Sequence, residues 1–230
     1  MTRTLITGAN KGLGFETARQ LIAAGGHTVW IGARDEERGR AAAEELGARF
    51  VQLDVTDDAS VAAAFKRIEA DGGLDVLVNN AGIGLLGLNG PDALRVFDTN
   101  AVGIVRVTEA ALPLLKNSDN PVVVNVSSAL GSFWANHEPS RPASQVSAIV
   151  YGASKAAVSM LTVQYARAVP QVKFNAVEPG YTATGLGGGD PATSAGRPVE
   201  ISARNIVRMA AIGKDGPTGT FQEDDGELGW

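Results

Sequence analysis

The sequence contains no cysteine, and its positive charges do not dominate. The absence of cysteine excludes disulfides, thiolate metal sites and thiol nucleophiles, and it agrees with a cytosolic protein. The chain has 20 lysines and arginines against 25 aspartates and glutamates, so its net charge is −5 at neutral pH. A protein that binds nucleic acid through a basic face is therefore not expected.

Long hydrophobic runs are also missing. No stretch reaches the roughly 18 apolar residues of a membrane span, and Arg106 and Glu109 interrupt the most apolar region, residues 101–115. The first residues show no secretory signal, so we expect the cytoplasm as the location and no membrane partner. The 230 residues, 44% of them hydrophobic, suffice for one core, and we expect residues 1–230 to form a single domain.

Short segments rich in β-branched residues alternate with longer segments that carry apolar residues at helical spacing. The predicted strands are Arg3–Thr7, Thr28–Ala33, Arg49–Leu53, Asp75–Val78, Pro121–Ser127 and Val172–Val177, with a last one near Gly219–Phe221. The predicted helices are Leu13–Ala24, Glu36–Leu46, Ser60–Ala70, Ala93–Leu115, Tyr151–Val169 and Val199–Ala211. This order predicts a doubly wound α/β, Rossmann-like fold, with a central parallel sheet of about seven strands and helices on both faces.

Two segments interrupt this alternation, Ala129–Ala148 and Thr182–Arg197. Both are rich in glycine, proline or small polar residues and are interpreted as long loops. Loops of this length in a compact domain are usually functional. The alternative for each is a tolerated surface insertion.

A glycine-rich segment, Thr7–Gly14, joins the first predicted strand to the first helix. Its glycines have the spacing Gly-x-x-x-Gly-x-Gly. Glycine lets the backbone approach a pyrophosphate, and the helix N-terminus supplies N–H donors. A plain tight turn is the alternative interpretation, because glycine also serves ordinary turns.

The second strand ends in Ala33 and Arg34. An arginine at this place accommodates the 2′-phosphate of NADP(H), and Lys11 adds a second positive charge, so we expect NADP(H) as the cofactor. Alternatively, both cations are solvated and pair with Asp35 or Glu36.

Polar residues also follow the third and fourth strands. Asp54 can accept a hydrogen bond from an adenine amino group, or it can cap the helix that starts near Asp57. Asn79 and Asn80 carry side-chain amides that can tie neighbouring loops together. Ala81 and Gly82 leave room for the adenosine ribose or for neighbouring backbone.

Tyr151 and Lys155 are four residues apart on a predicted helix and therefore share one face. A free phenol has a pKa near 10, and a positive charge at about 4 Å can lower it by up to about three units. That shift would bring the phenol close to the pH at which proton transfer is most effective. The same spacing also occurs by chance on ordinary helices.

The preceding strand ends in Ser127 and Ser128, at the edge where open α/β sheets bind ligands. Only one of the two serines is expected to face the ligand, because neighbouring side chains of a strand point in opposite directions. Asn100 lies on a predicted helix, where asparagine is unfavourable. We expect it either to hold a water leading to Lys155 or to mark a local helix distortion.

Taken together, these motifs resemble the short-chain dehydrogenase/reductase family, single-domain type, and most closely its NADPH-dependent carbonyl reductases. The resemblance covers essentially the whole chain and implies an oxidoreductase that needs no metal. It implies Tyr151 as general acid or base, Lys155 as the group that lowers the phenol pKa, Ser128 as the group that orients the carbonyl, and Asn100 as support for a proton-relay water. The cofactor-binding residues that it implies are Gly8, Asn10, Lys11, Gly12, Leu13, Gly14, Arg34, Asp54, Val55, Asn80, Ala81, Gly82, Tyr151, Lys155, Pro179, Gly180 and Thr182.

Ser128 lies farther before Tyr151 than in many relatives, because Ala129–Ala148 contains additional residues. Monomeric carbonyl reductases also carry an insertion here, so a monomer is plausible and a homo-oligomer stays open. Phe133 and Trp134 are interpreted as walls of the substrate pocket, with packing inside the loop as the alternative.

The leading hypothesis is NADPH-dependent reduction of a ketone or aldehyde. One alternative is a non-catalytic NADPH-binding regulator on the same fold. Another is a nucleotide-sugar epimerase or dehydratase, which shares the Tyr-x-x-x-Lys pair but usually needs a longer chain and a different glycine spacing.

Overall fold

The protein is built around one sheet of eight strands in the order β3-β2-β1-β4-β5-β6-β7-β8. The computed structural model describes residues 1–84, 88–186 and 190–230. Strands β1 to β7 pair in parallel, and β8 pairs antiparallel with β7. The strands span Thr2–Thr7, His27–Ala33, Arg49–Gln52, Val76–Asn79, Val122–Val126, Lys173–Val177, Thr220–Glu223 and Gly226–Glu227. The doubly wound α/β fold is confirmed, and the additional strand is the two-residue β8.

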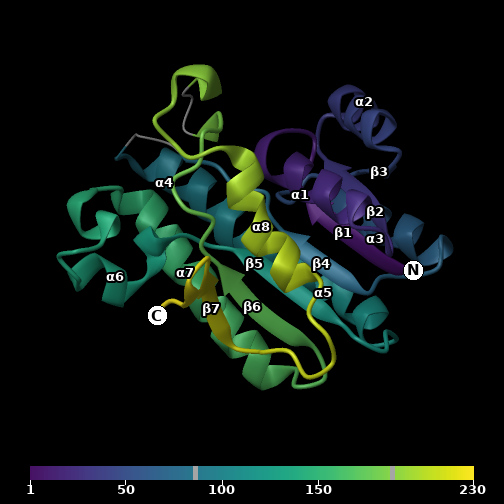
Figure 1. The fold of residues 1–230 in the computed structure, drawn as a ribbon. Helices are drawn as coiled ribbons and strands as arrows, with labels where there is room; N and C mark the ends of the chain where they lie inside the picture. Colours follow the sequence, from purple (N-terminus) through teal and green to yellow (C-terminus); the bar gives the residue numbers. More distant parts are fainter. Residues whose placement is uncertain (85–87, 187–189) are drawn as a thin grey trace.

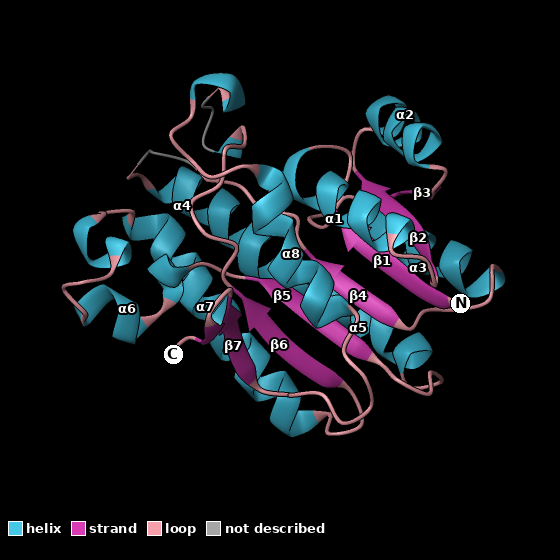
Figure 2. Cartoon of the chain, viewed as in Figure 1, coloured by secondary structure: helices cyan, strands magenta, loops and turns pink. Residues whose placement is uncertain are grey.

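Helices cover both faces of the sheet (Figures 1 and 2). One face packs against α3 (Asp58–Ala70), α5 (Gly103–Leu115) and α7 (Ile149–Ala168), and the other packs against α1 (Gly12–Ala23), α2 (Glu36–Leu46) and α8 (Val199–Ala210). Aspartates begin two of these helices: Asp35 accepts from the N–H of Arg38 and Asp57 from that of Ala59. Such caps satisfy N–H groups that have no partner inside the helix.

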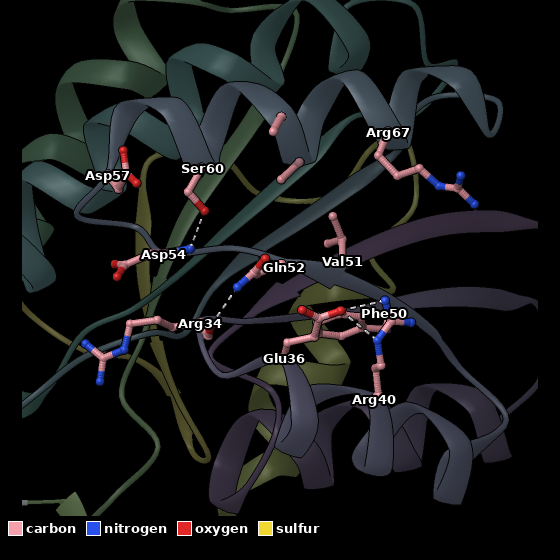
Figure 3. A pocket seen from close by; sticks show the side chains of 12 residues that line it. Arg34, Glu36, Arg40, Phe50, Val51, Gln52, Asp54, Asp57, Ser60 and Arg67 are labelled. Carbon is pink, nitrogen blue, oxygen red and sulfur yellow. Dashed lines mark hydrogen bonds and ion pairs between the residues drawn. The ribbon is translucent and has the colours of Figure 1, made fainter.

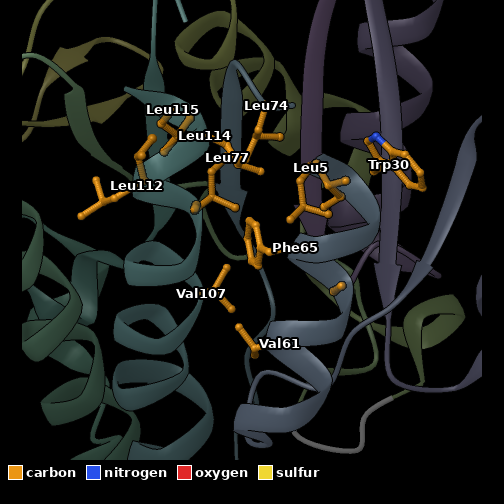
Figure 4. Close-up of a cluster of buried hydrophobic side chains, with 14 of the residues drawn as sticks. Leu5, Trp30, Val61, Phe65, Leu74, Leu77, Val107, Leu112, Leu114 and Leu115 are labelled. Carbon is orange, nitrogen blue, oxygen red and sulfur yellow. The ribbon is translucent and has the colours of Figure 1, made fainter. Parts of the chain in front are cut away.

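Alternation along the strands divides the core between the two faces. Leu5 and Ile6 are neighbours on β1, both fully buried, and they belong to different hydrophobic clusters. Figure 4 shows the cluster of Leu5, in which Leu77 from β4 meets Phe65 from α3 and Val107 from α5. Strands that are apolar on both sides are expected for a parallel sheet covered by helices.

The segment predicted as one helix, Ala93–Leu115, consists of three consecutive elements. Helix α4 (Gly90–Phe97) passes into the π-helical turn η1 (Asp98–Val102), which passes into α5. A π turn adds a residue to the helix and rotates the side chains that follow, and such turns are frequent at functional sites.

The segment predicted as an irregular loop, Ala129–Ala148, contains three short helices: η2 (Ala129–Gly131), α6 (Phe133–His137) and η3 (Pro142–Gln145). The prediction of a long irregular loop is correct only in part, because serine and proline begin short helical turns here: Ser132 caps α6, and Pro142 is the first residue of η3. The second segment, Thr182–Arg197, contains the short helix η5 (Pro191–Thr193), and its glycines 187–189 lie outside the described residues.

Within the described ranges, no helix is long and apolar enough to traverse a lipid bilayer.

The carboxyl ends of the parallel strands share one edge of the sheet, and the loops after β1, β2, β4, β5 and β6 meet there. In open α/β sheets this edge is where ligands bind.

Candidate active site

The turn between β1 and α1 closely approaches the loop after β4. Gly8 and Gly12 have φ angles of 65° and 56°, which glycine adopts without strain. A Cβ on Gly8 would lie 3.0 Å from the Cα of Ala81, and a Cβ on Gly14 would lie 2.5 Å from Nδ2 of Asn80. The predicted glycine turn is therefore a cradle that larger residues would fill.

The first turn of α1 keeps its backbone N–H groups free of side-chain caps. Its N-cap residue, the exposed Lys11, forms no capping hydrogen bond, and the first turn holds no acidic residue. Uncapped N–H groups and the helix dipole favour a phosphate at this end. The turn therefore fits the pyrophosphate of a dinucleotide.

The amide of Asn80 ties the two loops together, as the sequence predicted. Its Nδ2 donates to the carbonyl oxygen of Thr7 at 2.8 Å and to that of Gly8 at 3.3 Å. The hydroxyl oxygen of Thr7 accepts from the N–H groups of Asn80 and Ala81 at 3.0 and 2.9 Å. Asn79 points elsewhere, into a buried network with Thr108 and Asn125.

A cavity of about 750 Å³ opens at the ends of β2 and β3 (Figure 3). Arg34 lines it and pairs with no carboxylate among the described residues. The carboxylates beside it are engaged elsewhere, because Asp35 pairs with Arg38 at 2.8 Å and Glu36 with Arg40 at 2.7 Å. The alternative that Arg34 pairs with Asp35 or Glu36 is wrong, but Arg34 is exposed to solvent, as the same alternative expected, at the wall of the cavity.

Asp54 lies at the same end of this cavity as Arg34 (Figure 3). Its Oδ1 accepts from the N–H of Thr56 at 3.0 Å and from the hydroxyl of Thr56 at 2.7 Å. The interpretation of Asp54 as a helix cap is wrong, because Asp57 caps α3. The contact of Asp54 with the adenine stays a prediction.

Val55, the next predicted cofactor-binding residue, is buried against α5. A Cβ on Gly103 would lie 3.0 Å from the Val55 Cγ2.

Helix α7 brings Tyr151 and Lys155 to the end of β5. The Lys155 ammonium lies 5.6 Å from the centroid of the Tyr151 ring. It donates at 2.7 Å to the carbonyl oxygen of Val126, the last residue of β5. A Cβ on Gly82 would lie 3.7 Å from the Lys155 Nζ, so the loop after β4 also reaches this point. The predicted shared helix face is confirmed.

The pKa of Tyr151 differs from the sequence-based expectation. Burial, and then the charge of Glu178, raise the pKa of Tyr151 above its usual value, and a hydrogen bond with Ser128 lowers it only in part. Burial lowers the pKa of Lys155 to about 8, while Glu178 raises it. The expected lowering of the Tyr151 pKa is not found. The ammonium of Lys155 is directed at the carbonyl oxygen of Val126, and burial removes water from the phenol.

The two serines after β5 have different roles. The hydroxyl of Ser127 is buried and contacts the carbonyl oxygen of Lys155 and the hydroxyl of Ser159, both at 3.1 Å. Ser128 lies close enough to Tyr151 to lower the pKa of its phenol, and its hydroxyl accepts from the N–H of Leu130 at 3.3 Å. The alternation of strand side chains thus places Ser128, and not Ser127, beside Tyr151.

Asn100 lies in the π turn η1 and is fully buried. Its Nδ2 donates to the carbonyl oxygen of Ile83 at 2.9 Å and to the hydroxyl of Ser154 at 3.0 Å, and its Oδ1 accepts from the N–H of Ile83 at 2.8 Å. The predicted helix distortion is confirmed, and through it Asn100 links the loop after β4 to α7. Its support of a water beside Lys155 stays a prediction.

The loop after β6 carries Pro179, Gly180 and Thr182. Gly180 has a φ of 77°, and a Cβ there would lie 2.6 Å from the Nε of Arg197. The Thr182 hydroxyl contacts the carbonyl oxygen of Gly180 at 2.8 Å and the hydroxyl of Ser202 at 2.7 Å. This loop is therefore fixed to the segment that leads into α8.

Sequence reasoning missed Glu178, which precedes this loop and accepts hydrogen bonds from the N–H groups of Ala129 and Gly180. The signal was available, since Glu178 is a polar residue at the carboxyl end of a parallel strand, as Ser128 is.

The inserted segment packs against the C-terminal end of the chain (Figure 1). The N–H of Trp134 donates to the carbonyl oxygen of Trp230 at 3.0 Å, and Ser132 donates to that of Gly229 at 2.6 Å. A Cβ on Gly229 would lie 2.9 Å from the Trp134 ring. Trp134 therefore packs on the C-terminus, and it also packs inside its own segment, where the Arg141 guanidinium lies 5.5 Å from the centroid of its ring. Phe133 is exposed.

Three comparisons with known proteins agree. The family model of the short chain dehydrogenases matches residues 2–194. The short-chain dehydrogenase/reductase ATR10 of Stachybotrys chlorohalonatus is 38% identical, over 96% of this chain and 88% of that protein. Carbonyl reductase (NADPH) 1 of Sus scrofa is 33% identical, over 98% of this chain and 93% of that protein.

Solved structures show the same fold. The NADPH-bound carbonyl reductase from chicken fatty liver superposes with a TM-score of 0.84 at 26% identity, covering 100% of this chain and 99% of that one. Salutaridine reductase from Papaver somniferum has a TM-score of 0.82 at 27% identity, covering 97% of this chain and 100% of that one. The chain belongs to the short-chain dehydrogenase family of oxidoreductases, whose members bind a nicotinamide cofactor.

Proposed function

We propose that this protein is an NADPH-dependent reductase of ketones or aldehydes, and that residues 1–230 act as one catalytic domain. The observation that carries the proposal is the meeting of Ser128, Tyr151 and Lys155 at the carboxyl end of β5, where the Lys155 ammonium lies 5.6 Å from the centroid of the Tyr151 ring and Ser128 lies beside the phenol. The named carbonyl reductases among the relatives support the same chemistry.

Tyr151 is the proton donor in this proposal. Burial raises the pKa of Tyr151 above its usual value, so the phenol is protonated at neutral pH and can donate to a carbonyl oxygen that Ser128 orients. The nicotinamide supplies the hydride when it is bound. Lys155 has a pKa of about 8 and is positively charged at neutral pH, which favours the developing phenolate.

NADPH is proposed over NADH because Arg34 lines the cavity at the end of β2 and pairs with no carboxylate in the described part of the chain. A 2′-phosphate beside this guanidinium would gain a charge-assisted hydrogen bond. The glycine cradle, Asn10, Leu13 and the loop at Pro179 and Thr182 complete the proposed cofactor site. The pig and chicken carbonyl reductases are named as NADPH enzymes.

A matched pair of variants tests the proposal. Tyr151→Phe removes the proton donor, and we expect kcat for a ketone that the wild type reduces to fall at least about 100-fold, the lower range for general acid catalysis. Tyr165→Phe is the control, because Tyr165 lies on the same helix and, among the described residues, its hydroxyl bonds only to the exposed Glu109. NADPH consumption measures both. Near-wild-type turnover by Tyr151→Phe would refute the mechanism.

A further inference from the structure

Glu178 is a carboxylate for which the proposed reaction has no use. It follows β6 directly, and its backbone N–H donates to the carbonyl oxygen of Gln222 on β7 at 2.8 Å, which fixes its place in the sheet. Its Oε1 accepts from the N–H of Gly180 at 2.7 Å, and its Oε2 accepts from the N–H of Ala129. One side chain therefore joins the turn after β5 to the turn after β6.

Both turns carry residues of the candidate site. Ala129 directly follows Ser128, which lies beside the Tyr151 phenol. Gly180 directly follows Pro179 in the proposed cofactor loop. Because both acceptor oxygens belong to one rigid carboxylate, a shift of either turn would break a hydrogen bond to an ionised group, which is stronger than a neutral one.

The charges around Glu178 come from every element packed against it. Tyr151 and Lys155 face it from α7, Arg141 from the inserted segment, Arg197 from the segment before α8, and Glu223 from β7.

The two arginines have carboxylate partners of their own, since Arg141 pairs with Glu223 and Arg197 pairs with Asp224. Lys155 has no carboxylate within ion-pair distance among the described residues. Glu178 is thus the carboxylate whose charge acts on both Tyr151 and Lys155.

We propose that Glu178 is a positioning residue of the active site, whose carboxylate holds the turn of Ser128 against the turn of Gly180 and supplies the counter-charge to Lys155. This inference rests on the proposed function. A negative charge at this place disfavours the phenolate of Tyr151 and favours the ammonium of Lys155. It therefore raises the pH at which the phenol loses its proton.

The effect of the Glu178 charge on the pKa of Tyr151 can be tested through the pH dependence of alcohol oxidation. Alcohol oxidation needs the phenolate, so its kcat rises with pH as the phenol loses its proton. Glu178→Gln removes the charge but keeps the shape, and we expect the rising limb of kcat against pH to move to lower pH by about one unit. The assay uses the full chain, NADP⁺ and a secondary alcohol that the wild type oxidises.

Two variants separate charge from structure. Glu178→Asp keeps the charge but is too short to reach both N–H groups, so we expect a lowered melting temperature and a rising limb at the wild-type pH. Glu223→Gln removes another carboxylate near Glu178 that does not face Tyr151, and we expect no shift of the limb. An unmoved limb in Glu178→Gln, or equal shifts in Glu178→Gln and Glu178→Asp, would overturn the proposal.

If Glu178→Gln does not fold, a measurement on the wild-type protein tests the charge of Glu178 instead. Burial raises the pKa of Glu178 above its usual value, although the N–H groups of Ala129 and Gly180 oppose this. Carbon-13 NMR should show that the Glu178 carboxyl is ionised over the pH range of the rising limb, and a carboxyl that stays protonated there would overturn the inference.

The two proposals fail in different ways. Full activity of Tyr151→Phe refutes the proposed function. Loss of activity in Tyr151→Phe together with an unmoved limb in Glu178→Gln refutes only the role of Glu178.

Discussion

Gly14→Ala adds one methyl group at the closest contact of the glycine cradle. The new Cβ would lie 2.5 Å from Nδ2 of Asn80, 3.0 Å from the Cα of Ala9 and 3.0 Å from the carbonyl oxygen of Gly8. The last two contacts are with backbone, so the turn itself must move. The first contact displaces the amide that donates to Thr7 at 2.8 Å.

The magnitude follows from these contacts. Overpacking of this kind costs about 1–3 kcal/mol, and a lost hydrogen bond costs about 1 kcal/mol more. Alanine regains up to about 1 kcal/mol, because Gly14 lies within α1 and alanine is the better helix former. We expect a net destabilisation of about 2 kcal/mol, which lowers the melting temperature by roughly 4–8 °C in a domain of this size.

Gly90→Ala is the matched control. Gly90 is the first residue of α4, and a Cβ there would meet nothing within 4 Å. We expect its stability to change by less than about 0.5 kcal/mol. Thermal unfolding measures stability, and quenching of protein fluorescence by NADPH measures the dissociation constant. Equal melting temperatures and equal NADPH affinities for the two variants would refute the role of the cradle.

Two further predictions concern charged side chains. Arg34→Ala should lower the ratio of kcat/KM with NADPH to kcat/KM with NADH about tenfold or more; an unchanged ratio would mean that Arg34 does not read the 2′-phosphate. Asp75 accepts from the N–H and Nε of Arg3 at 2.8 and 2.9 Å and from Ser118 at 2.6 Å. Although burial opposes it, these bonds lower the pKa of Asp75 to about 2. The stabilisation is present above the unfolded-state pKa of about 4 and is lost as the pH falls toward 2. Asp75→Asn should therefore cost about 1–2 kcal/mol at neutral pH, and urea unfolding should show a smaller difference from wild type near pH 3.

The sequence by itself determined the order of strands and helices and most of the residues at the ligand-binding edge. Apolar runs and helical periodicity are local properties, and the right-handed crossover fixes how such units join. The spacing of Tyr151 and Lys155 fixed their shared helix face in the same way. The polar residues after each strand predicted which side chains meet, because the carboxyl ends of parallel strands share one edge.

Only the tertiary structure decided contacts between segments far apart in the chain. The residues alone left the choice between Ser127 and Ser128 open, although the family resemblance implied Ser128, and the position of α7 brings Ser128 beside Tyr151. The raised pKa of Tyr151 required its burial and the charge of Glu178, which lies 27 positions farther along the chain. The packing of Trp134 on the C-terminus depended on contacts with Gly229 and Trp230. Burial, and the charges that burial brings together, depend on the whole fold, so local sequence patterns do not reveal them.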